Sequence, residues 1–301
     1  MNEELTKHLV PGHTSCAGCG IPAIVRAVLG ESKDPVVVAN ATGCAEVTTT
    51  IYPYTAWNVP YIHNAFENAA ATISGVEKAY EALKKQGKVK DKINFVVFSG
   101  DGGTFDIGLQ SLSGALERGH HFLYVCYDNG GYMNTGNQRS SATPFGAFTE
   151  TTPNGKESFG KMEKRKNIME IVKAHGVEYL AQANVAFMED LKKKARRALE
   201  TKGPSFLLVF QPCTANWKFP TSQYVEVGKL ATETNFWPLY EIKDGKYIVN
   251  WATEKPKPVE EFLKTQGRFK HLFSEKNKPV IEKIQEEVDK EWKKLVNIAE
   301  I

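Results

Sequence analysis

Four cysteines are the residues whose types and spacing first suggest chemistry. Cys16 and Cys19 lie in HTSCAGCGIP, with the two-residue spacing that zinc knuckles, redox-active dithiols and iron–sulfur sites share. Cys44 and Cys213 are isolated, in NATGCAEVT and FQPCTANW. A dithiol would leave these two unexplained and a zinc knuckle normally uses two closely spaced pairs, whereas a [4Fe-4S] cluster accepts four dispersed thiolates. The spacing alone leaves all three kinds of site open.

A glycine-rich segment, SGDGGTFDIG, contains the next candidates. Asp101 follows an apolar run in this segment, and a helix is predicted to begin about four residues later. Small residues let the backbone approach a diphosphate, the N-terminus of a helix attracts the anion, and a carboxylate adds an oxygen ligand for Mg²⁺. The glycines that would line the diphosphate are Gly100, Gly102 and Gly103. An ordinary tight turn explains GDGG equally well.

Asn129 makes the interpretation of Asp101 more specific. It follows Asp101 by 28 residues, in CYDNGGYMNTG, at the end of the next apolar run. This distance corresponds to one strand–helix–strand unit, which places the two strand ends side by side in a parallel sheet. The two side chains could then share one hard cation that bridges a diphosphate.

Five nearly continuous apolar runs predict the strands that position these residues. They lie at 35–39, 93–98, 122–127, 177–181 and 205–210. Helical patterns lie near 63–86, 106–118, 162–175 and 186–201. The alternation predicts an α/β fold with a mostly parallel sheet and helices on both faces. Ligands bind at the carboxyl ends of such strands, which is also where Cys44 and Cys213 are expected.

The pattern changes after residue 211. We expect residues 1–211 to form the α/β domain and residues 212–301 to form a C-terminal extension. The extension should contain a hairpin over 235–250 that turns at Asp244–Gly245, an extended arm leading into a helix, and a last helix near 279–298.

Composition limits the possible classes of protein. The 301 residues are 42% hydrophobic, enough for a sizeable core, and predict a soluble globular protein. MNEELTKHLV has no leader-like apolar run, and no apolar segment is long enough to span a membrane, so we expect a cytoplasmic protein.

Charge and cysteine content exclude two further classes. The net charge of +3 is nearly balanced, and LKKKARRALE is interpreted as a solvated helix face, so no nucleic-acid partner is expected. Five cysteines in the cytoplasm do not favour a disulfide framework, and Cys126, inside FLYVCY, is interpreted as a buried apolar residue.

Five segments together resemble a known family. They are GHTSCAGCG, ATGCAEV, SGDGGTFDIGLQSLSGALERG, YDNGGYMNTGNQRSSATPFGA and KTQGRFKHLF. GDG followed by a strand-ending Asn is similar to the thiamine diphosphate signature. The whole set resembles the β subunit of a 2-oxoacid:ferredoxin oxidoreductase of the pyruvate:ferredoxin oxidoreductase (pyruvate synthase) type, over about residues 10–273.

The resemblance implies a fold, cofactors and site residues. The fold would be the diphosphate-binding half of a thiamine diphosphate-binding fold, and Asp101, the Asn129 side chain and the Gly131 carbonyl would hold Mg²⁺. Asn134 would face the substrate and the reacting carbon. One proximal [4Fe-4S] cluster, beside the N-terminal segment, would be held by Cys16, Cys19, Cys44 and Cys213.

The resemblance also implies an activity and partners. A 2-oxoacid, coenzyme A and oxidised ferredoxin would give acyl-CoA, CO2 and reduced ferredoxin, reversibly. Pyruvate is the expected substrate, while 2-oxoisovalerate or another small 2-oxoacid such as oxalate stays open, as does the physiological direction. An α subunit would supply the carboxylate that activates the cofactor, with γ and δ subunits beside it, δ carrying two more clusters. An iron–sulfur electron-transfer or metal-stabilised binding subunit, and a thiamine-dependent decarboxylase without a cluster, are the alternatives.

Other polar residues have two interpretations each. His13 tunes the cluster or contacts the substrate, or it is structural. Glu46 reaches the cofactor region, or it forms a buried pair or cap. Arg139 binds phosphate or a partner subunit, or it orders its loop by an ion pair.

Two helix starts are also predicted. His63 and Asn64 are expected to open the helix over 63–86 and to have a structural or capping role there. Asp106 is expected to begin the helix after the glycines, stabilised by the helix dipole.

Overall fold

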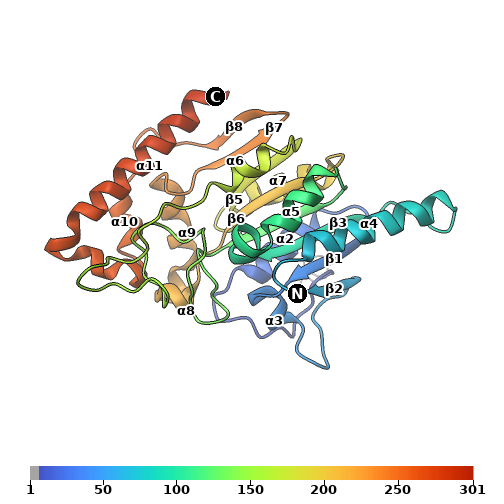
Figure 1. Cartoon of the computed structure of the whole chain (residues 1–301), viewed down its shortest axis with the longest axis horizontal. Helices are drawn as coiled ribbons and strands as arrows, with labels where there is room; N and C mark the ends of the chain where they lie inside the picture. Colours follow the sequence, from blue (N-terminus) through green and yellow to red (C-terminus); the bar gives the residue numbers. More distant parts are fainter. Residues whose placement is uncertain (1–6, 301) are drawn as a thin grey trace.

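A nine-stranded sheet organises the part of the chain that the computed structural model describes, residues 7–300 (Figure 1). The prediction that the first ten residues contain no leader lies partly outside this range, because residues 1–6 are not described. The spatial order of the strands is β2-β1-β3-β4-β6-β5-β7-β8-β9. Their bounds are Val36–Ala41 (β1), Tyr61–Asn64 (β2), Asn94–Gly100 (β3), Leu123–Asp128 (β4), Tyr179–Asn184 (β5), Ser205–Phe210 (β6), Leu239–Lys243 (β7), Lys246–Trp251 (β8) and Ala299–Glu300 (β9).

Helices connect and cover the strands. The α-helices are Ile21–Gly30 (α2), Cys44–Thr49 (α3), Ala69–Lys85 (α4), Leu109–Glu117 (α5), Ile168–Lys173 (α6), Met188–Glu200 (α7), Thr214–Trp217 (α8), Tyr224–Glu233 (α9), Val259–Leu263 (α10) and Lys278–Ile298 (α11). A π-helical turn, η1, spans Gly103–Ile107, and shorter 3₁₀ turns are Thr221–Gln223 (η2), Gly267–Phe273 (η3) and Glu275–Asn277 (η4).

Six neighbouring strands, in the spatial order β2-β1-β3-β4-β6-β5, are parallel to one another. This arrangement confirms the predicted fold class. In β3, Phe95 and Val97 belong to the core on one face of the sheet, and Val96 and Phe98 belong to the core on the other. Burial on both faces is why the parallel strands are visible in the sequence as continuous apolar runs. All five predicted strands exist, with boundaries shifted by no more than a few residues.

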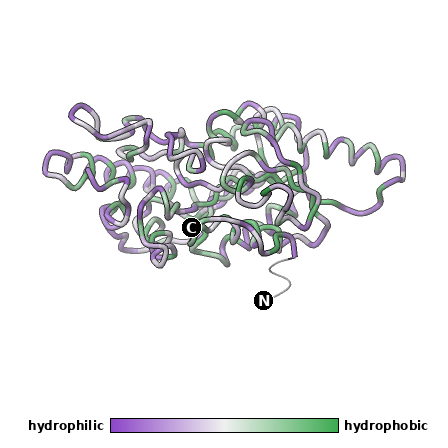
Figure 2. Tube along the Cα trace, turned by 90° about the horizontal axis from the view of Figure 1, so that it is seen from below, coloured by the Kyte–Doolittle hydropathy of each residue, from purple (hydrophilic) through white to green (hydrophobic). Residues whose placement is uncertain are grey.

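Helices cover both faces, as predicted. Helices α4, α5 and α6 contribute to the core on one face, together with residues from α9, α10 and α11, while α2 and α7 contribute to the core on the other face. Figure 2 shows hydrophobic stretches mainly in the middle of the molecule and hydrophilic stretches at its two outer ends. No helix within residues 7–300 has the length and apolar character needed to cross a membrane.

The helix predicted over 63–86 begins only at Ala69, so the prediction that His63 and Asn64 open or cap it is wrong. Their structural interpretation agrees with their place in the sheet. Both residues lie on the edge strand β2, where Thr42 N donates to Asn64 O at 2.9 Å. Backbone pairing with β1 satisfies these polar groups, which is a tertiary effect that local propensity does not contain. The sequence also gave no prediction for β2 or α2.

The start predicted for the next helix is also wrong. The backbone is already helical at Asp101, and Asp106 lies inside the π turn η1. The Asp106 carboxylate accepts from the Ser141 backbone N–H at 3.0 Å and from the Ser141 hydroxyl. Asp106 therefore holds the 140s loop against η1. The helix predicted over 162–175 is only α6, which Asn167 caps by accepting from Glu170 N at 3.3 Å.

The C-terminal segment continues the sheet. β7 pairs antiparallel with β5, and β7 and β8 form the predicted hairpin, whose turn residues Asp244 and Gly245 have φ of 50° and 79°. Two positive φ values are typical of the tight turns that favour Asp-Gly. Helix α11 extends along this side of the molecule (Figure 1). The division at 211/212 stays a prediction, since one sheet continues across it.

Candidate active site

The carboxyl ends of the parallel strands bring the predicted site residues to one edge of the sheet. Cys44 begins α3 after β1, Asp101 follows β3, and Asn129 follows β4. β3 and β4 are neighbours, with Gly100 opposite Tyr127. Asn129 N donates to Asp101 Oδ1 at 3.2 Å, so these two residues, 28 positions apart, are in direct contact.

Asp101 is fully buried and held in one orientation. Its Oδ2 accepts from the Ser140 hydroxyl, and its Oδ1 accepts from the Asn129 backbone. Burial, with the nearby Asp128 carboxylate as the second cause, raises the pKa of Asp101 to about 8. A buried carboxylate of this kind is costly unless a cation neutralises it.

Three oxygen atoms converge beside Asp101. Asn129 Oδ1 lies 2.9 Å from Gly131 O and 3.0 Å from Asp101 Oδ1, and when Asp101 is ionised none of these three oxygens carries a hydrogen to donate. The Asn129 amide is turned this way because its Nδ2 donates to Gln211 Oε1 at 3.2 Å. Three acceptors this close repel one another unless a cation lies between them, and oxygen ligands of this set suit Mg²⁺. The residues present therefore fit the predicted magnesium site.

Two of the glycines are required by packing within the chain. A Cβ at Gly102 would lie 2.3 Å from the Tyr132 ring, and one at Gly103 would lie 2.6 Å from Ser99 Oγ. The helical backbone that starts here presents its N-terminal N–H groups at the edge of the sheet, which is the arrangement that binds anions.

A small cleft follows this edge, with a cavity volume of about 30 Å³. Its lining includes Gly100, Gly102, Gly103, Asn129, Gly131, Asn134 and Cys44. Asn134 is exposed on this lining. A pocket that encloses a small-molecule ligand usually measures roughly 300–1,000 Å³. This chain therefore presents a wall rather than a closed pocket.

Hydrogen bonds tie the three cysteine-bearing segments together. Thr214, next to Cys213, donates to Ala17 O at 3.1 Å, between Cys16 and Cys19. Gln211 Nε2 lies 3.8 Å from Cys19 Sγ. Thr48, whose hydroxyl donates to Cys44 O at 2.8 Å, also contacts Ser15 Oγ at 2.9 Å. The four cysteines thus belong to one cluster of segments at the same edge as Asp101.

The Cys19 and Cys44 thiols are partly buried and lie close enough to other thiols for these to affect their pKa. Burial raises the pKa of Cys19 to about 11 and that of Cys44 to about 12, and neighbouring thiols contribute to both shifts. Within residues 7–300 no three His, Cys, Asp or Glu side chains form a group that could hold one metal ion. A zinc ion would bind all four thiolates at one metal, whereas a cubane binds each thiolate to a separate iron.

Several buried polar atoms around the thiols have no hydrogen-bond partner among the described residues. They are His13 Nδ1, Tyr127 Oη, Tyr224 Oη and Arg268 Nη1. Such atoms normally have partners, and a group of unpartnered ones indicates a missing acceptor. The sulfur atoms of a cluster would be such acceptors. The donors present are therefore compatible with the predicted [4Fe-4S] site.

Arg268 adds positive charge to this region. It is buried, it forms no ion pair among residues 7–300, and its guanidinium lies 3.6 Å from the centre of the Trp217 ring. Burial lowers its pKa to about 9, so it still carries its charge at neutral pH. Trp217 Nε1 donates to Asn129 O at 2.9 Å, which connects Arg268 to the oxygen site.

Comparisons with known proteins agree with this geometry. A family model described as thiamine pyrophosphate enzyme, C-terminal TPP binding domain, matches residues 41–209. The pyruvate synthase subunit PorB of Thermotoga maritima is 53% identical over 97% of this chain and 92% of the relative. The chain belongs to the 2-oxoacid:ferredoxin oxidoreductase β subunits of the pyruvate synthase type. The predicted family is confirmed.

Other relatives of this β subunit are similar over nearly its full length. PorB of Methanothermobacter thermautotrophicus is 52% identical over 93% of this chain and 94% of the relative. The ketoisovalerate oxidoreductase subunit VorB of Pyrococcus abyssi is 45% identical over 96% and 93%. The 2-oxoglutarate:ferredoxin oxidoreductase of Magnetococcus marinus, solved with 2-oxoglutarate, coenzyme A and succinyl-CoA, matches with a TM-score of 0.59 at 24% identity, over 70% of this chain and 68% of that one. The last match supports the fold alone.

Two further candidate residues of this β subunit have partners in the chain. Glu46 is buried, accepts from Thr50 Oγ1 at 3.0 Å and lies 3.8 Å from His63 Nε2. Arg139 lies 3.7 Å from the Glu163 carboxylate. These contacts agree with the structural interpretation of each residue. Cys126 is fully buried in β4, as predicted.

Sequence reasoning missed Gln211, Ser140, Tyr127, Tyr224 and Arg268. Gln211 carried a usable signal, because it directly follows β6 at the carboxyl edge of the sheet, two residues before Cys213. The others reach the site through loop and helix packing, for which the sequence offers no periodic signal.

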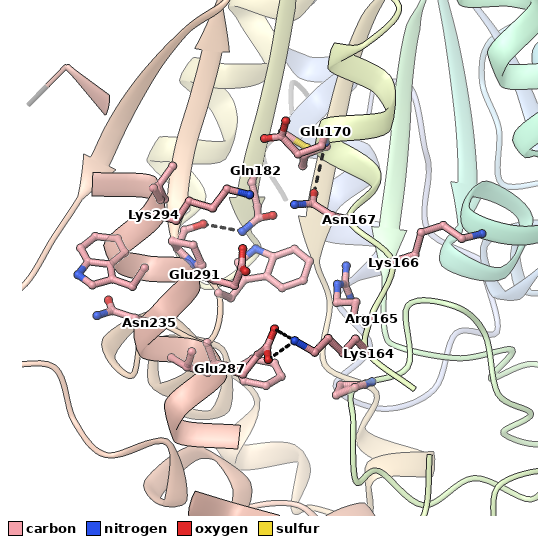
Figure 3. Close-up of a pocket in the computed structure, with 18 of the residues that line it drawn as sticks. Lys164, Arg165, Lys166, Asn167, Glu170, Gln182, Asn235, Glu287, Glu291 and Lys294 are labelled. Atoms are coloured by element: carbon pink, nitrogen blue, oxygen red, sulfur yellow. Dashed lines mark hydrogen bonds and ion pairs between the residues drawn. The ribbon is translucent and has the colours of Figure 1, made fainter. Parts of the chain in front are cut away.

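Figure 3 shows a larger cavity of this β subunit, of about 590 Å³, and none of the four cysteines lines it. It is bounded by α6 with its preceding loop, by β7 and by α11. Lys164 and Glu287 form an ion pair across it. Arg165, on its wall, pairs with Asp128 and lies 4.9 Å from the centre of the Trp237 ring.

Proposed function

We propose that this chain, together with partner subunits, catalyses the CoA-dependent oxidative decarboxylation of pyruvate to acetyl-CoA and CO2. Two electrons leave through a proximal [4Fe-4S] cluster to ferredoxin. The observation that carries the proposal is the convergence of Asp101, Asn129 and Gly131 oxygens at the edge where the cysteine segments also meet.

The oxygen site is proposed to hold Mg²⁺ and, through it, thiamine diphosphate. Asp101, the Asn129 side chain and the Gly131 carbonyl are the proposed ligands, and the Asn129–Gln211 hydrogen bond supports this orientation. The backbone at Gly100, Gly102 and Gly103 lines the proposed diphosphate position. When bound, thiamine diphosphate would supply a nucleophilic carbanion for the 2-oxo carbon and a thiazolium ring that takes up the electron pair left when CO2 departs.

Cys16, Cys19, Cys44 and Cys213 are the proposed cluster ligands. The hydrogen bonds that join their segments and the unpartnered donors beside them support this assignment. Arg268 would partly neutralise the negative charge of a thiolate-bound cluster. Asn134 is the proposed substrate-facing residue, since it is exposed and lines the cleft that Cys44 also lines.

The second wall of the site is proposed to belong to an α subunit. A cleft of about 30 Å³ cannot enclose the cofactor, and its aminopyrimidine ring needs a carboxylate from another domain. The relatives named above are subunits of larger enzymes. We propose γ and δ subunits as further partners, δ carrying two clusters that connect to ferredoxin.

A group of exposed apolar side chains supports the partner proposal and can be tested. Tyr52 and Tyr54 are 93% and 79% exposed, and Val47 and Ile51 lie beside them in sequence and are also exposed. The group follows Cys44 along the chain, and exposed apolar patches of this kind mark interfaces. We expect the double variant Tyr52→Ser/Tyr54→Ser to lose co-purification with the α subunit, measured by pull-down from a co-expressing strain.

Stability provides the control for this variant. Substitutions of exposed side chains usually change the free energy of unfolding by no more than about 0.5 kcal/mol, so the melting temperature of the β subunit should stay constant. Val225→Ser, an exposed apolar position on α9, should leave assembly unchanged. Normal assembly of the double tyrosine variant would place the interface elsewhere.

The function itself is tested with the intact complex purified anaerobically. Reduction of ferredoxin or a viologen dye should require CoA and be much faster with pyruvate than with 2-oxoisovalerate. The reverse preference would keep the mechanism and assign the substrate of the ketoisovalerate relatives. No reduction with any 2-oxoacid, despite bound iron and thiamine diphosphate, would contradict the proposal.

A further inference from the structure

Gln211 contacts both halves of the proposed site. It is 1% exposed, and its backbone N–H donates to Asp128 O at 2.8 Å, which fixes it at the end of β6. Its side-chain oxygen accepts from Asn129 Nδ2 at 3.2 Å, and its side-chain nitrogen lies 3.8 Å from Cys19 Sγ. One carboxamide therefore joins the oxygen site to a thiol.

The orientation of this carboxamide is determined by a backbone carbonyl. Gln211 Nε2 donates to Pro212 O at 2.7 Å, and a carbonyl oxygen can only accept. The Gln211 oxygen is therefore left for Asn129, whose NH2 group must face it. Asn129 Oδ1 then has to face Gly131 O and Asp101 Oδ1. If the Asn129 amide were turned around, its oxygen would face the Gln211 oxygen, and both are acceptors. If the Gln211 amide turned as well, its oxygen would face the Pro212 carbonyl oxygen, which is also an acceptor.

The same NH2 group is directed toward Cys19. Amide hydrogen bonds to the sulfurs of an iron–sulfur cluster stabilise the additional negative charge of the reduced state, and so raise its reduction potential. Because Gln211 is buried, water does not compete for this bond, and its electrostatic effect is stronger than at the surface.

We propose that Gln211 is a positioning residue that serves both cofactors at once. Its oxygen holds the Asn129 amide in the cation-binding orientation, and its nitrogen donates to the Cys19 thiolate and sets the potential of the proximal cluster. The inference deepens the proposed function and rests on it. It links the site that releases the electrons to the site that receives them.

The test uses Gln211→Met in the whole complex, since methionine has a similar volume and no amide. The Kd of magnesium-dependent thiamine diphosphate binding should rise about 10- to 100-fold, the usual cost of losing a partner of a metal ligand. The midpoint potential of the proximal cluster, from an EPR-monitored redox titration, should become more negative. Gln182→Met is the control, because this buried β5 glutamine donates to Pro238 O at 2.8 Å and should leave both values unchanged.

Gln211→Glu separates the effect on the thiamine diphosphate Kd from the effect on the cluster potential. It also provides a second test if the Gln211→Met complex does not assemble. A carboxyl oxygen still accepts from Asn129, so the Kd should change less than in Gln211→Met. A protonated glutamate has one hydrogen to donate, so it can bond to Pro212 O or to Cys19 Sγ but not to both. The midpoint potential of the proximal cluster should therefore still fall. Wild-type Kd and potential in a loaded Gln211→Met or Gln211→Glu complex would overturn this inference alone. A wild-type complex with zinc or no metal at the cysteines would overturn the proposed function as well.

Discussion

Asp101→Asn is expected to abolish CoA-dependent 2-oxoacid oxidation and to weaken magnesium-dependent thiamine diphosphate binding by at least about 100-fold. Loss of a residue that only hydrogen-bonds to a metal ligand lowers metal affinity about 10- to 100-fold, and Asp101 is proposed as a direct ligand. Asparagine keeps the shape of the side chain and an acceptor for Asn129 N, but it removes the charge that neutralises the cation. Titration calorimetry on the intact complex, with Mg²⁺ present and absent, measures the change.

Stability separates this expectation from general damage. Burial raises the pKa of Asp101 to about 8, far above its value in an unfolded chain. A carboxyl group with a raised pKa destabilises the fold once the pH exceeds the unfolded pKa, because the native state disfavours its ionised form. The neutral asparagine should therefore keep or raise the melting temperature of the cofactor-free complex at pH 7.

Asp106→Asn is the matched control. Asp106 binds the backbone and hydroxyl of Ser141 much as Asp101 binds Ser140, but it lies in η1 and has a cationic partner within the chain, Lys166, whose Nζ is 3.8 Å from its carboxylate. Its substitution should leave the thiamine diphosphate Kd within about threefold of wild type. Equal loss in both variants would mean that the loop, and not a cation, explains the Asp101 result.

Cys213→Ala and Cys44→Ala are each expected to remove the proximal cluster and with it ferredoxin reduction. Cubane clusters in proteins are usually held by four thiolates, and neither residue has a substitute thiol among its described neighbours beyond the proposed set. Iron content should fall by about four atoms per β subunit, and the EPR signal of the proximal cluster should disappear. The clusters proposed on the δ subunit should keep their signals.

Cys126→Ala controls for the loss of a cysteine as such. Cys126 is fully buried in β4 and belongs to the apolar core. Its substitution should cost on the order of 1 kcal/mol of stability for a small cavity and leave the iron content unchanged. A full complement of iron in Cys44→Ala would contradict the proposed ligand set, and stoichiometric zinc in the wild type would replace the cluster altogether.

The sequence alone was sufficient to predict an element wherever its residue pattern is compatible with one local structure. Continuous apolar runs such as 205–210 are explained by strands buried on both faces, and this strand is found with the predicted bounds. The 28-residue spacing of Asp101 and Asn129 follows from one strand–helix–strand unit. Asp-Gly at 244–245 predicted the hairpin because few other residues adopt two positive φ values.

Tertiary structure decided the features that depend on distant partners. β2 exists because β1 offers it backbone hydrogen bonds, and Asp106 is a loop anchor because Ser141 packs against it. Neither contact leaves a local signal, so both positions were assigned wrongly to helix starts.

The sequence by itself determined the family, the sheet and the residue types at its carboxyl edge, because these follow from periodicity and motif spacing. Only the tertiary structure decided how the amides there are turned. The chain of bonds from Pro212 O through Gln211 to Asn129 sets that orientation. The physical reason is that a hydrogen-bond network depends on which donor faces which acceptor in three dimensions, and residue order does not contain this information.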